Sequence, residues 1–214
     1  MLTIGISKGE DALKKMQRAL DAAGTPLQKY NDDALQMYSP CGALHAYLLR
    51  TRRVPYLVKE GHLDLGITGE DILEERGPGD CVVLAYLLSE EFGLRATRVA
   101  LFSAADDSVC RAQDIPSGST ITSEYFRMTH RFFAPRTDLH IDLTPGGSEA
   151  EVPLAYRFGV GVVDSGRTLF ANNLKEVCTI FTSRPVLVAN RKTLADKKKR
   201  QEIKRFVRAL RIVL

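Results

Sequence analysis

The chain has 214 residues, of which 44% are hydrophobic and 26% are charged, and its formal net charge is +4. This length allows one large domain or two small ones, and the composition is that of an ordinary globular protein. Because no apolar run approaches the roughly 20 residues of a membrane-spanning helix and no secretory leader opens the sequence, we expect a cytoplasmic protein without a membrane partner.

The first fifty residues contain both clear and weak patterns. Leu2–Ile6 has the pattern of a strand, and apolar residues at helical spacing predict a helix over 10–23 that Gly24 ends. The segment 27–37 is poorly patterned, and residues 43–49 fit either a strand or a short helix. The sequence therefore predicts a strand followed by a helix and leaves the next two segments undecided.

Residues 54–73 predict a helix, a strand and the start of a second helix. Apolar residues recur at helical spacing up to Gly61, and 63–68 reads as a short buried strand. Gly69 follows, and acidic residues beginning with Glu70 occupy the next turn, where the helix macrodipole favours negative charge. Such a turn exposes backbone N–H groups, so it is either a ligand site or a plain connection between strand and helix.

The rest of the chain continues the alternation of strands and helices. We expect strands at 81–88, 98–103, 120–122, 139–143 and 159–163, and helical segments at 125–133 and 168–173. The dense turn signal Thr144-Pro145-Gly146-Gly147-Ser148 is expected to open a helix through Leu154. Residues 177–189 are expected to be extended, and 195–214 to form an amphipathic helix. This alternation predicts α/β layers with a mostly parallel sheet.

The basic and cysteine residues exclude two classes of site. The run Lys197-Lys198-Lys199-Arg200 has no interleaved aromatic residue before Phe206, so we expect a solvated helix face and no nucleic-acid partner. The cysteines form no CxxC pair and have no histidine at metal-ligand spacing. They are Cys41, Cys81, Cys110 and Cys178. We therefore expect reduced thiols and no protein metal site.

Several segments resemble motifs of the ATP phosphoribosyltransferases, the enzymes that open histidine biosynthesis. Residues 54–73 (VPYLVKEGHLDLGITGEDIL) are similar to that family's proline-led helix and its DLGITG strand. Ile4–Gly9 (IGISKG) resembles the opening strand and Lys-Gly turn, and 123–133 (SEYFRMTHRFF) resembles the Tyr-x-x-x-Thr-x-x-Phe helix. Gly147-Ser148 and Ser165–Leu169 (SGRTL) resemble the phosphoribosyl-binding end. The resemblance covers nearly the whole chain.

The resemblance implies a fold and an assembly. The fold is α/β, with two α/β domains of periplasmic-binding-protein type II architecture around a central cleft. The first domain would be 1–92 plus 178–214, and the second, 93–177, would carry the phosphoribosyl-binding loop. The length corresponds to the short form of the family, which implies a homodimer able to join a regulatory subunit similar to histidyl-tRNA synthetase.

The implied reaction transfers a phosphoribosyl group from 5-phosphoribosyl pyrophosphate to N1 of ATP, releasing pyrophosphate with Mg²⁺ as cofactor. Such a site needs amide-lined turns, cations and a carboxylate. The implied phosphoribosyl pyrophosphate-binding residues are Asp164, Ser165, Gly166, Arg167 and Thr168. The implied catalytic cations facing the pyrophosphate are Lys8 and Arg50. The implied nucleotide-binding residues are Gly69, Glu70, Glu124 and Tyr125.

The sequence departs from the family pattern at several motifs, and two of these departures concern the predicted site. Asp164 directly precedes Ser165, so either the phosphoribosyl loop has lost three residues or Gly161 stands in the place of the family's aspartate. Glu10 replaces the arginine of the usual Lys-Gly-Arg turn. Two alternatives to an active enzyme follow: a diverged relative retained as an interaction subunit, or a cytosolic module that binds small anions.

Overall fold

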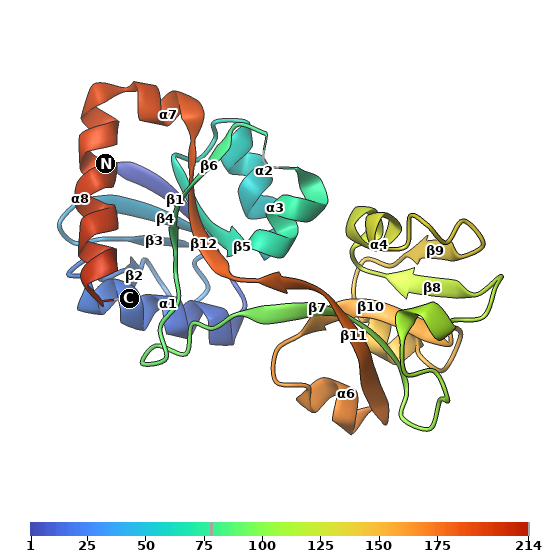
Figure 1. Ribbon diagram of the computed structural model, residues 1–214. Helices are drawn as coiled ribbons and strands as arrows, with labels where there is room; N and C mark the ends of the chain where they lie inside the picture. Colours follow the sequence, from blue (N-terminus) through green and yellow to red (C-terminus); the bar gives the residue numbers. More distant parts are fainter. Residues whose placement is uncertain (78, 214) are drawn as a thin grey trace. The chain divides into compact units, whose positions relative to one another are not determined.

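The computed structural model describes residues 1–77 and 79–213 (Figure 1). The chain forms two compact units, the first made of Met1–Leu73, Gly77–Arg95 and Arg184–Leu214 and the second of Glu74–Arg76 and Ala96–Ser183. Apart from Glu74–Arg76, the chain leaves the first unit after residue 95 and returns at 184, whereas the family resemblance places these changes after residues 92 and 177. Each unit has its own sheet.

The first unit is built on a mixed sheet. Its strands are β1 (Leu2–Ser7), β2 (Gln28–Lys29), β3 (Gln36–Tyr38), β4 (Leu44–Leu49), β5 (Leu65–Gly69), β6 (Cys81–Tyr86) and β12 (Pro185–Asn190), in the order β2-β3-β4-β1-β5-β12-β6. β1 is parallel to β4 and β5, and the other neighbours are antiparallel. The prediction of a mostly parallel sheet is therefore wrong. β2, β3 and β4 follow one another through short connections, which makes them antiparallel. β12 lies between β5 and β6 and is antiparallel to both.

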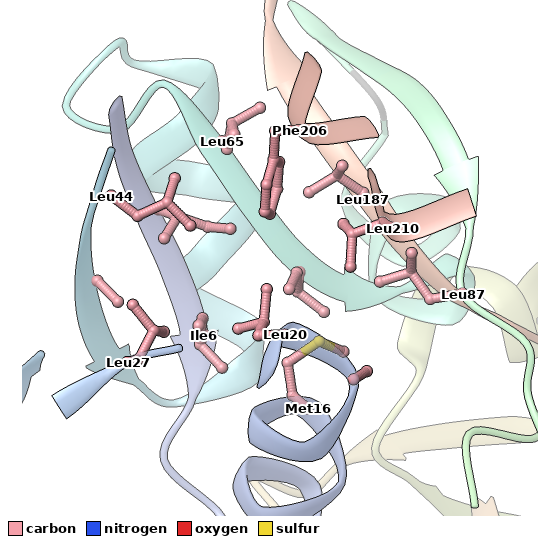
Figure 2. Packing of buried hydrophobic residues seen from close by; sticks show 14 of the residues in the cluster. Ile6, Met16, Leu20, Leu27, Leu44, Leu65, Leu87, Leu187, Phe206 and Leu210 are labelled. Carbon is pink, nitrogen blue, oxygen red and sulfur yellow. The ribbon is translucent and has the colours of Figure 1, made fainter. Parts of the chain in front are cut away.

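Helices cover both faces of this sheet. They are α1 (Glu10–Ala22), the 3₁₀ turn η1 (Thr51–Arg53), α2 (Val54–Lys59), α3 (Glu70–Arg76), α7 (Arg191–Ala195) and α8 (Lys197–Val213). α1 and α8 pack Met16, Leu20, Phe206 and Leu210 into the main core (Figure 2). On the other face, Val54 and Val58 of α2 pack close to Gly66, where an added Cβ would lie 2.5 Å from Val54. A glycine is thus required at this point of β5.

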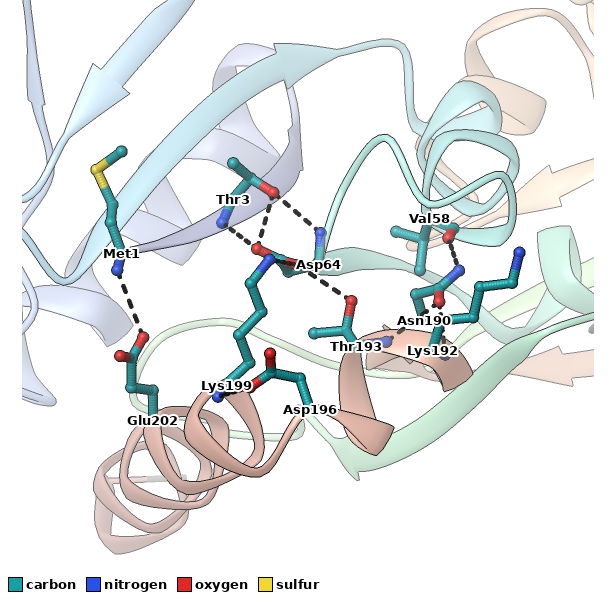
Figure 3. Close-up of polar contacts among 10 residues, drawn as sticks. All are labelled: Met1, Thr3, Val58, Asp64, Asn190, Lys192, Thr193, Asp196, Lys199 and Glu202. Carbon is teal, nitrogen blue, oxygen red and sulfur yellow. Dashed lines mark hydrogen bonds and ion pairs between the residues drawn. The ribbon is translucent and has the colours of Figure 1, made fainter.

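A buried carboxylate ties the C-terminal helices to the amino end of this sheet (Figure 3). Asp64 Oδ2 accepts hydrogen bonds from Thr3 N at 3.0 Å and Thr3 Oγ1 at 3.2 Å. Its Oδ1 accepts from Lys199 Nζ at 2.7 Å and Thr193 Oγ1 at 3.1 Å. Burial raises the pKa of Asp64, but the bonds from Lys199, Thr3 and Thr193 outweigh it and hold this pKa below its usual value. The helix predicted over 195–214 is present as α8, and Asp196 separates it from α7, a short helix that the sequence did not predict.

The second unit has a five-stranded sheet that is also mixed. Its strands are β7 (Thr97–Ala104), β8 (Thr120–Ser123), β9 (His140–Leu143), β10 (Phe158–Val163) and β11 (Leu174–Ser183), in the order β11-β7-β10-β8-β9. Its helices are η2 (Ala112–Asp114), α4 (Phe126–Phe132), α5 (Ser148–Glu151) and α6 (Arg167–Ala171). β8 is parallel to β9 and β10, whereas β7 is antiparallel to β10 and β11. α5 is shorter than predicted because Pro153 disfavours helix at the residue before it.

Candidate functional site

The carboxyl edge of the first sheet gathers two predicted cations. β1 and β4 are parallel with Ser7 opposite Leu49, so the next residues, Lys8 and Arg50, emerge together. Lys8 N donates to Leu49 O at 2.8 Å, which fixes one turn against the other. Both cationic residues are exposed. In open α/β sheets, ligands bind beyond the carboxyl ends of the strands, so this edge is a candidate anion site.

The Ser7 hydroxyl joins the turns that carry these cations. It accepts a hydrogen bond from Thr51 Oγ1 at 2.7 Å and from Gly9 N at 3.3 Å. The turn after β1 and the turn after β4 are therefore fixed to each other through one side chain. The departure at Glu10 does not place an acid between them, because the Glu10 carboxylate pairs with Lys14 Nζ at 2.6 Å on the surface of α1.

The turn after β5 reaches the same edge, but its carboxylate is already engaged. Gly5 of β1 lies opposite Gly66 of β5, which brings Gly69 level with Lys8. The following residue, Glu70, is bound by Arg184, with Nε 2.7 Å from Oε2 and Nη2 2.9 Å from Oε1. The Arg184 guanidinium lowers the pKa of Glu70, so the pair is ionic. Gly69 thus stays a predicted nucleotide contact, whereas the Glu70 carboxylate holds Arg184.

The carboxyl edge of the second sheet gathers three turns. Ser123 at the end of β8 lies opposite both Leu143 of β9 and Val160 of β10. The segments 124–125, 144–148 and 164–168 follow these three parallel strands on the same side of the sheet, and β10 continues three residues past Val160 before Asp164. This edge holds Glu124, the Gly-Gly-Ser turn and all five predicted phosphoribosyl-binding residues.

The segment 164–168 is open to solvent and rich in donors. Asp164, Ser165, Arg167 and Thr168 are exposed, and Gly166 adopts a left-handed conformation with φ of 77°. Arg167 donates to Ser165 Oγ through Nε at 3.2 Å. A left-handed glycine followed by a short helix points backbone N–H groups and two hydroxyls outward. This arrangement can bind an anionic group such as a phosphate.

The structure shows what surrounds Gly161, one of the two positions that could correspond to the family's aspartate. Gly161 lies inside β10, and an added Cβ would be 2.8 Å from Ser148 Oγ and 3.5 Å from the Phe102 ring. An aspartate at this position would displace its neighbours. Asp164 is the first residue after β10, so the carboxylate next to the turn 165–168 in this chain is Asp164 under either alignment.

The two remaining nucleotide-binding candidates differ in accessibility. Glu124 Oε1 accepts hydrogen bonds from Gly147 N at 3.1 Å and Ser148 Oγ at 3.3 Å, so it holds the Gly-Gly-Ser turn. The Tyr125 side chain is only 3% exposed and packs in the core of the second unit. Glu124 thus lies at the candidate site, whereas the Tyr125 side chain is part of the core of the second unit.

Comparison with known proteins decides the family. The description "ATP phosphoribosyltransferase" belongs to the family model that matches residues 50–212. The ATP phosphoribosyltransferase of Cyanothece sp. is 32% identical over 196 residues, covering 89% of this chain and 87% of that protein. This chain belongs to the ATP phosphoribosyltransferase family, the enzymes that open histidine biosynthesis.

Other relatives differ in length. The ATP phosphoribosyltransferase of Geotalea daltonii is also 32% identical, over 173 residues, but this chain covers only 59% of it. Among solved structures, the ATP phosphoribosyl transferase (HisG:HisZ) complex from Thermotoga maritima contains a chain that is 23% identical, with a TM-score of 0.77 over 100% of this chain and 97% of that one. A Candida albicans protein with the generic periplasmic binding protein fold has a TM-score of 0.58 at 11% identity, over 100% of this chain and 70% of that one. The predicted fold is confirmed.

Sequence reasoning missed the residues that position these turns. Ser7 lies in the IGISKG segment, but its partner Thr51 is 44 residues away, and Arg184 lies 114 residues from Glu70. Among residues 1–77 and 79–213, no group of three or more histidine, cysteine or acidic side chains could hold a metal ion. In the same part of the chain, no helix combines the length and apolarity needed to cross a membrane.

Proposed function

We propose that this chain transfers the phosphoribosyl group of 5-phosphoribosyl pyrophosphate to N1 of ATP and releases pyrophosphate. Family membership supports the activity. The assignment of residues rests on the carboxyl edges of the two sheets. Lys8 and Arg50 offer cations at one edge. Asp164 to Thr168 offer a carboxylate, hydroxyls and backbone donors at the other.

The roles follow from the chemistry of the reaction. N1 of adenine carries a usable lone pair, so the chain need not remove a proton before attack on the anomeric carbon. The barrier then depends on placing the two substrates and on stabilising the negative charge that develops on the departing pyrophosphate. We assign that charge stabilisation to Lys8 and Arg50, binding of the 5-phosphate to the turn 165–168, and binding of ribose hydroxyls to Asp164.

We also propose that Mg²⁺ arrives as part of the substrate. Magnesium is commonly bound through substrate phosphates, water and one or two carboxylates, without a dedicated protein cage. Asp164 and Glu124 follow β10 and β8 at the carboxyl edge of the second sheet, and either carboxylate could contribute an oxygen to a magnesium–pyrophosphate chelate. The chain's own task would be to orient that chelate.

For the assembly, we propose a homodimer that can join a regulatory subunit similar to histidyl-tRNA synthetase. Support comes from the Thermotoga maritima neighbour, which is described as an ATP phosphoribosyl transferase (HisG:HisZ) complex. We further propose a cytoplasmic location, which the free cysteines support, since Cys41 and Cys110 are exposed thiols.

Turnover tests the proposal directly. The purified chain would be mixed with 5-phosphoribosyl pyrophosphate, ATP and Mg²⁺, alone and with a candidate regulatory subunit, and both pyrophosphate release and phosphoribosyl-ATP would be measured. We expect the two products in equal amounts. Pyrophosphate without phosphoribosyl-ATP would indicate hydrolysis, and absence of both in each mixture would refute the assignment.

A further inference from the structure

Glu70 and Arg184 form a closed set of contacts at the carboxyl edge of the first sheet. In addition to the two side-chain bonds, Glu70 N donates to Arg184 O at 3.0 Å, and Arg184 N donates to Glu70 Oε2 at 3.1 Å. The two residues directly follow and precede the paired residues Gly69 and Pro185. The pairing of β5 with β12 therefore continues for one more residue pair, through one backbone–backbone and one backbone–side-chain hydrogen bond.

An aromatic ring fixes the guanidinium from a third strand. The Arg184 guanidinium carbon lies 3.8 Å from the centre of the Tyr86 ring, at the end of β6. Val186 lies opposite Tyr86 in the β6–β12 ladder, so the ring reaches the same edge. A cation held by a bidentate carboxylate on one side and an aromatic face on the other has little freedom to turn toward a ligand.

The Glu70–Arg184 pair lies beside the candidate anion site, so its net charge affects anion binding there. Glu70 follows Gly69, and the β1–β5 register brings that turn level with Lys8, one strand away. Neighbouring strands lie about 4.8 Å apart. A bare carboxylate at this point would oppose the cations of Lys8 and Arg50 and repel a polyanion. Paired with Arg184, it contributes almost no net charge to the edge.

We propose that Arg184 is a positioning residue that neutralises Glu70 and so keeps the Lys8–Arg50 edge able to bind pyrophosphate. The inference rests on the proposed function only for the identity of the anion. Arg184 acts through Glu70 and does not itself contact substrate. The carboxylate of Glu70, in turn, anchors the strand that returns from the second unit and is not a nucleotide ligand.

A four-member mutant cycle tests this assignment, with Mg²⁺–pyrophosphate binding measured by titration calorimetry. We expect Arg184→Ala to raise the dissociation constant about three- to tenfold at low salt, because it exposes the Glu70 charge. Glu70→Ala should bind at least as tightly as wild type, and Arg184→Ala/Glu70→Ala should return to within about twofold of it. Raising the salt to about 0.5 M should shrink the defect of Arg184→Ala, since screening weakens exposed charges.

Arg157→Ala is the matched control. Arg157 also makes a bidentate ion pair, with Asp107 at 2.6 and 3.0 Å, and also lies over an aromatic ring, that of Phe158 at 5.1 Å. It precedes β10 and thus lies at the amino end of that strand. This variant should reproduce the stability change of Arg184→Ala, measured by urea unfolding, without weakening pyrophosphate binding.

The outcomes separate this inference from the proposed function. If Arg184→Ala binds normally, or if the double variant stays as weak as Arg184→Ala, Arg184 is not a neutralising residue and the inference is overturned. The second result would make it a direct ligand. If the cycle behaves as expected while wild type makes no phosphoribosyl-ATP, the inference holds and the proposed function fails. A wild type that binds no pyrophosphate would refute both.

Discussion

The two carboxyl edges share a topology and differ in chemistry. Each is formed where parallel strands end, yet the first presents the cations Lys8 and Arg50, whereas the second presents hydroxyls, glycine turns and the carboxylates Glu124 and Asp164. The cations of the first edge suit a compact polyanion. The hydroxyls, glycine turns and carboxylates of the second edge suit a phosphorylated sugar, whose phosphate and hydroxyl groups they can bind. The same sheet geometry thus specifies where ligands bind, and the residues after each strand specify which ligand.

The largest expected effect comes from removing a cation of the first edge. Arg50→Ala should lower turnover about a hundred- to a thousandfold, since loss of one preorganised charge contact costs about 2.7–4 kcal/mol of barrier. The effect on ATP affinity should be much smaller. Steady-state kinetics with both substrates varied would measure the two effects separately.

A neighbouring arginine provides the control for this prediction. Arg53 is three residues away, but its guanidinium lies 4.4 Å from the centre of the Tyr56 ring on α2. Arg53→Ala should therefore change turnover less than about threefold. Full turnover in Arg50→Ala would show that the assignment of this arginine is wrong. An equal loss in both variants would show that the first edge acts through general charge.

Removal of one hydroxyl at the second edge should have the next largest effect. Thr168→Ala should weaken binding of 5-phosphoribosyl pyrophosphate about ten- to a hundredfold, because a hydrogen bond to a charged acceptor contributes about 1.5–3 kcal/mol. Thr168→Ser keeps the hydroxyl and should bind nearly as well as wild type. Calorimetry would measure both, and an unchanged dissociation constant for Thr168→Ala would place the phosphate elsewhere.

The sequence predicts those parts of the site that are local motifs. The helix, strand and turn of 54–73 appear as α2, β5 and the start of α3, and the SGRTL segment forms the turn before α6. These segments are specified by residues close together in the chain, where glycine, proline and apolar spacing act directly. The fold class follows from the same patterns.

The parts that could not be predicted depend on distant partners. Residues 27–37 have little pattern because β2 and β3 are short strands that are defined by their pairing, β2 with β3 and β3 with β4. The Glu70–Arg184 contact joins residues 114 positions apart, so no window of sequence contains it. The excluded volume at Gly161 likewise comes from Ser148, which only the folded sheet brings near.

The glycine at position 161 gives a test of how the second edge is packed. Gly161→Ala should lower the free energy of unfolding by about 1–3 kcal/mol, because the new methyl group overlaps Ser148 Oγ. Ser148→Ala introduced together with it removes that oxygen and should recover part of the loss. Urea unfolding would compare the wild type, Gly161→Ala and the double variant. Equal stability of Gly161→Ala and wild type would mean that the second edge tolerates a side chain here.

The smallest effect on function is expected at the opposite end of β5, where Asp64 lies. Its pKa is held below the unfolded value of about 3.9, so its contribution to stability is complete above that value and is lost as the pH falls through the folded-state pKa. Asp64→Asn should therefore lower the free energy of unfolding by about 1–3 kcal/mol at pH 7, and this difference should close as the pH is lowered below about 4.

Pyrophosphate binding should be unchanged in Asp64→Asn, because Thr3, Thr193 and Lys199 hold this carboxylate at the amino end of the sheet. Lys199→Met, which removes the ammonium and keeps much of the stem, should reproduce the pH dependence of the stability loss. Urea unfolding between pH 3 and 8 would measure it, beside calorimetry at pH 7. A binding defect in Asp64→Asn would show that the amino end of the first sheet influences its carboxyl edge. The difference between the two carboxyl edges would then depend on more than the residues that directly follow each strand.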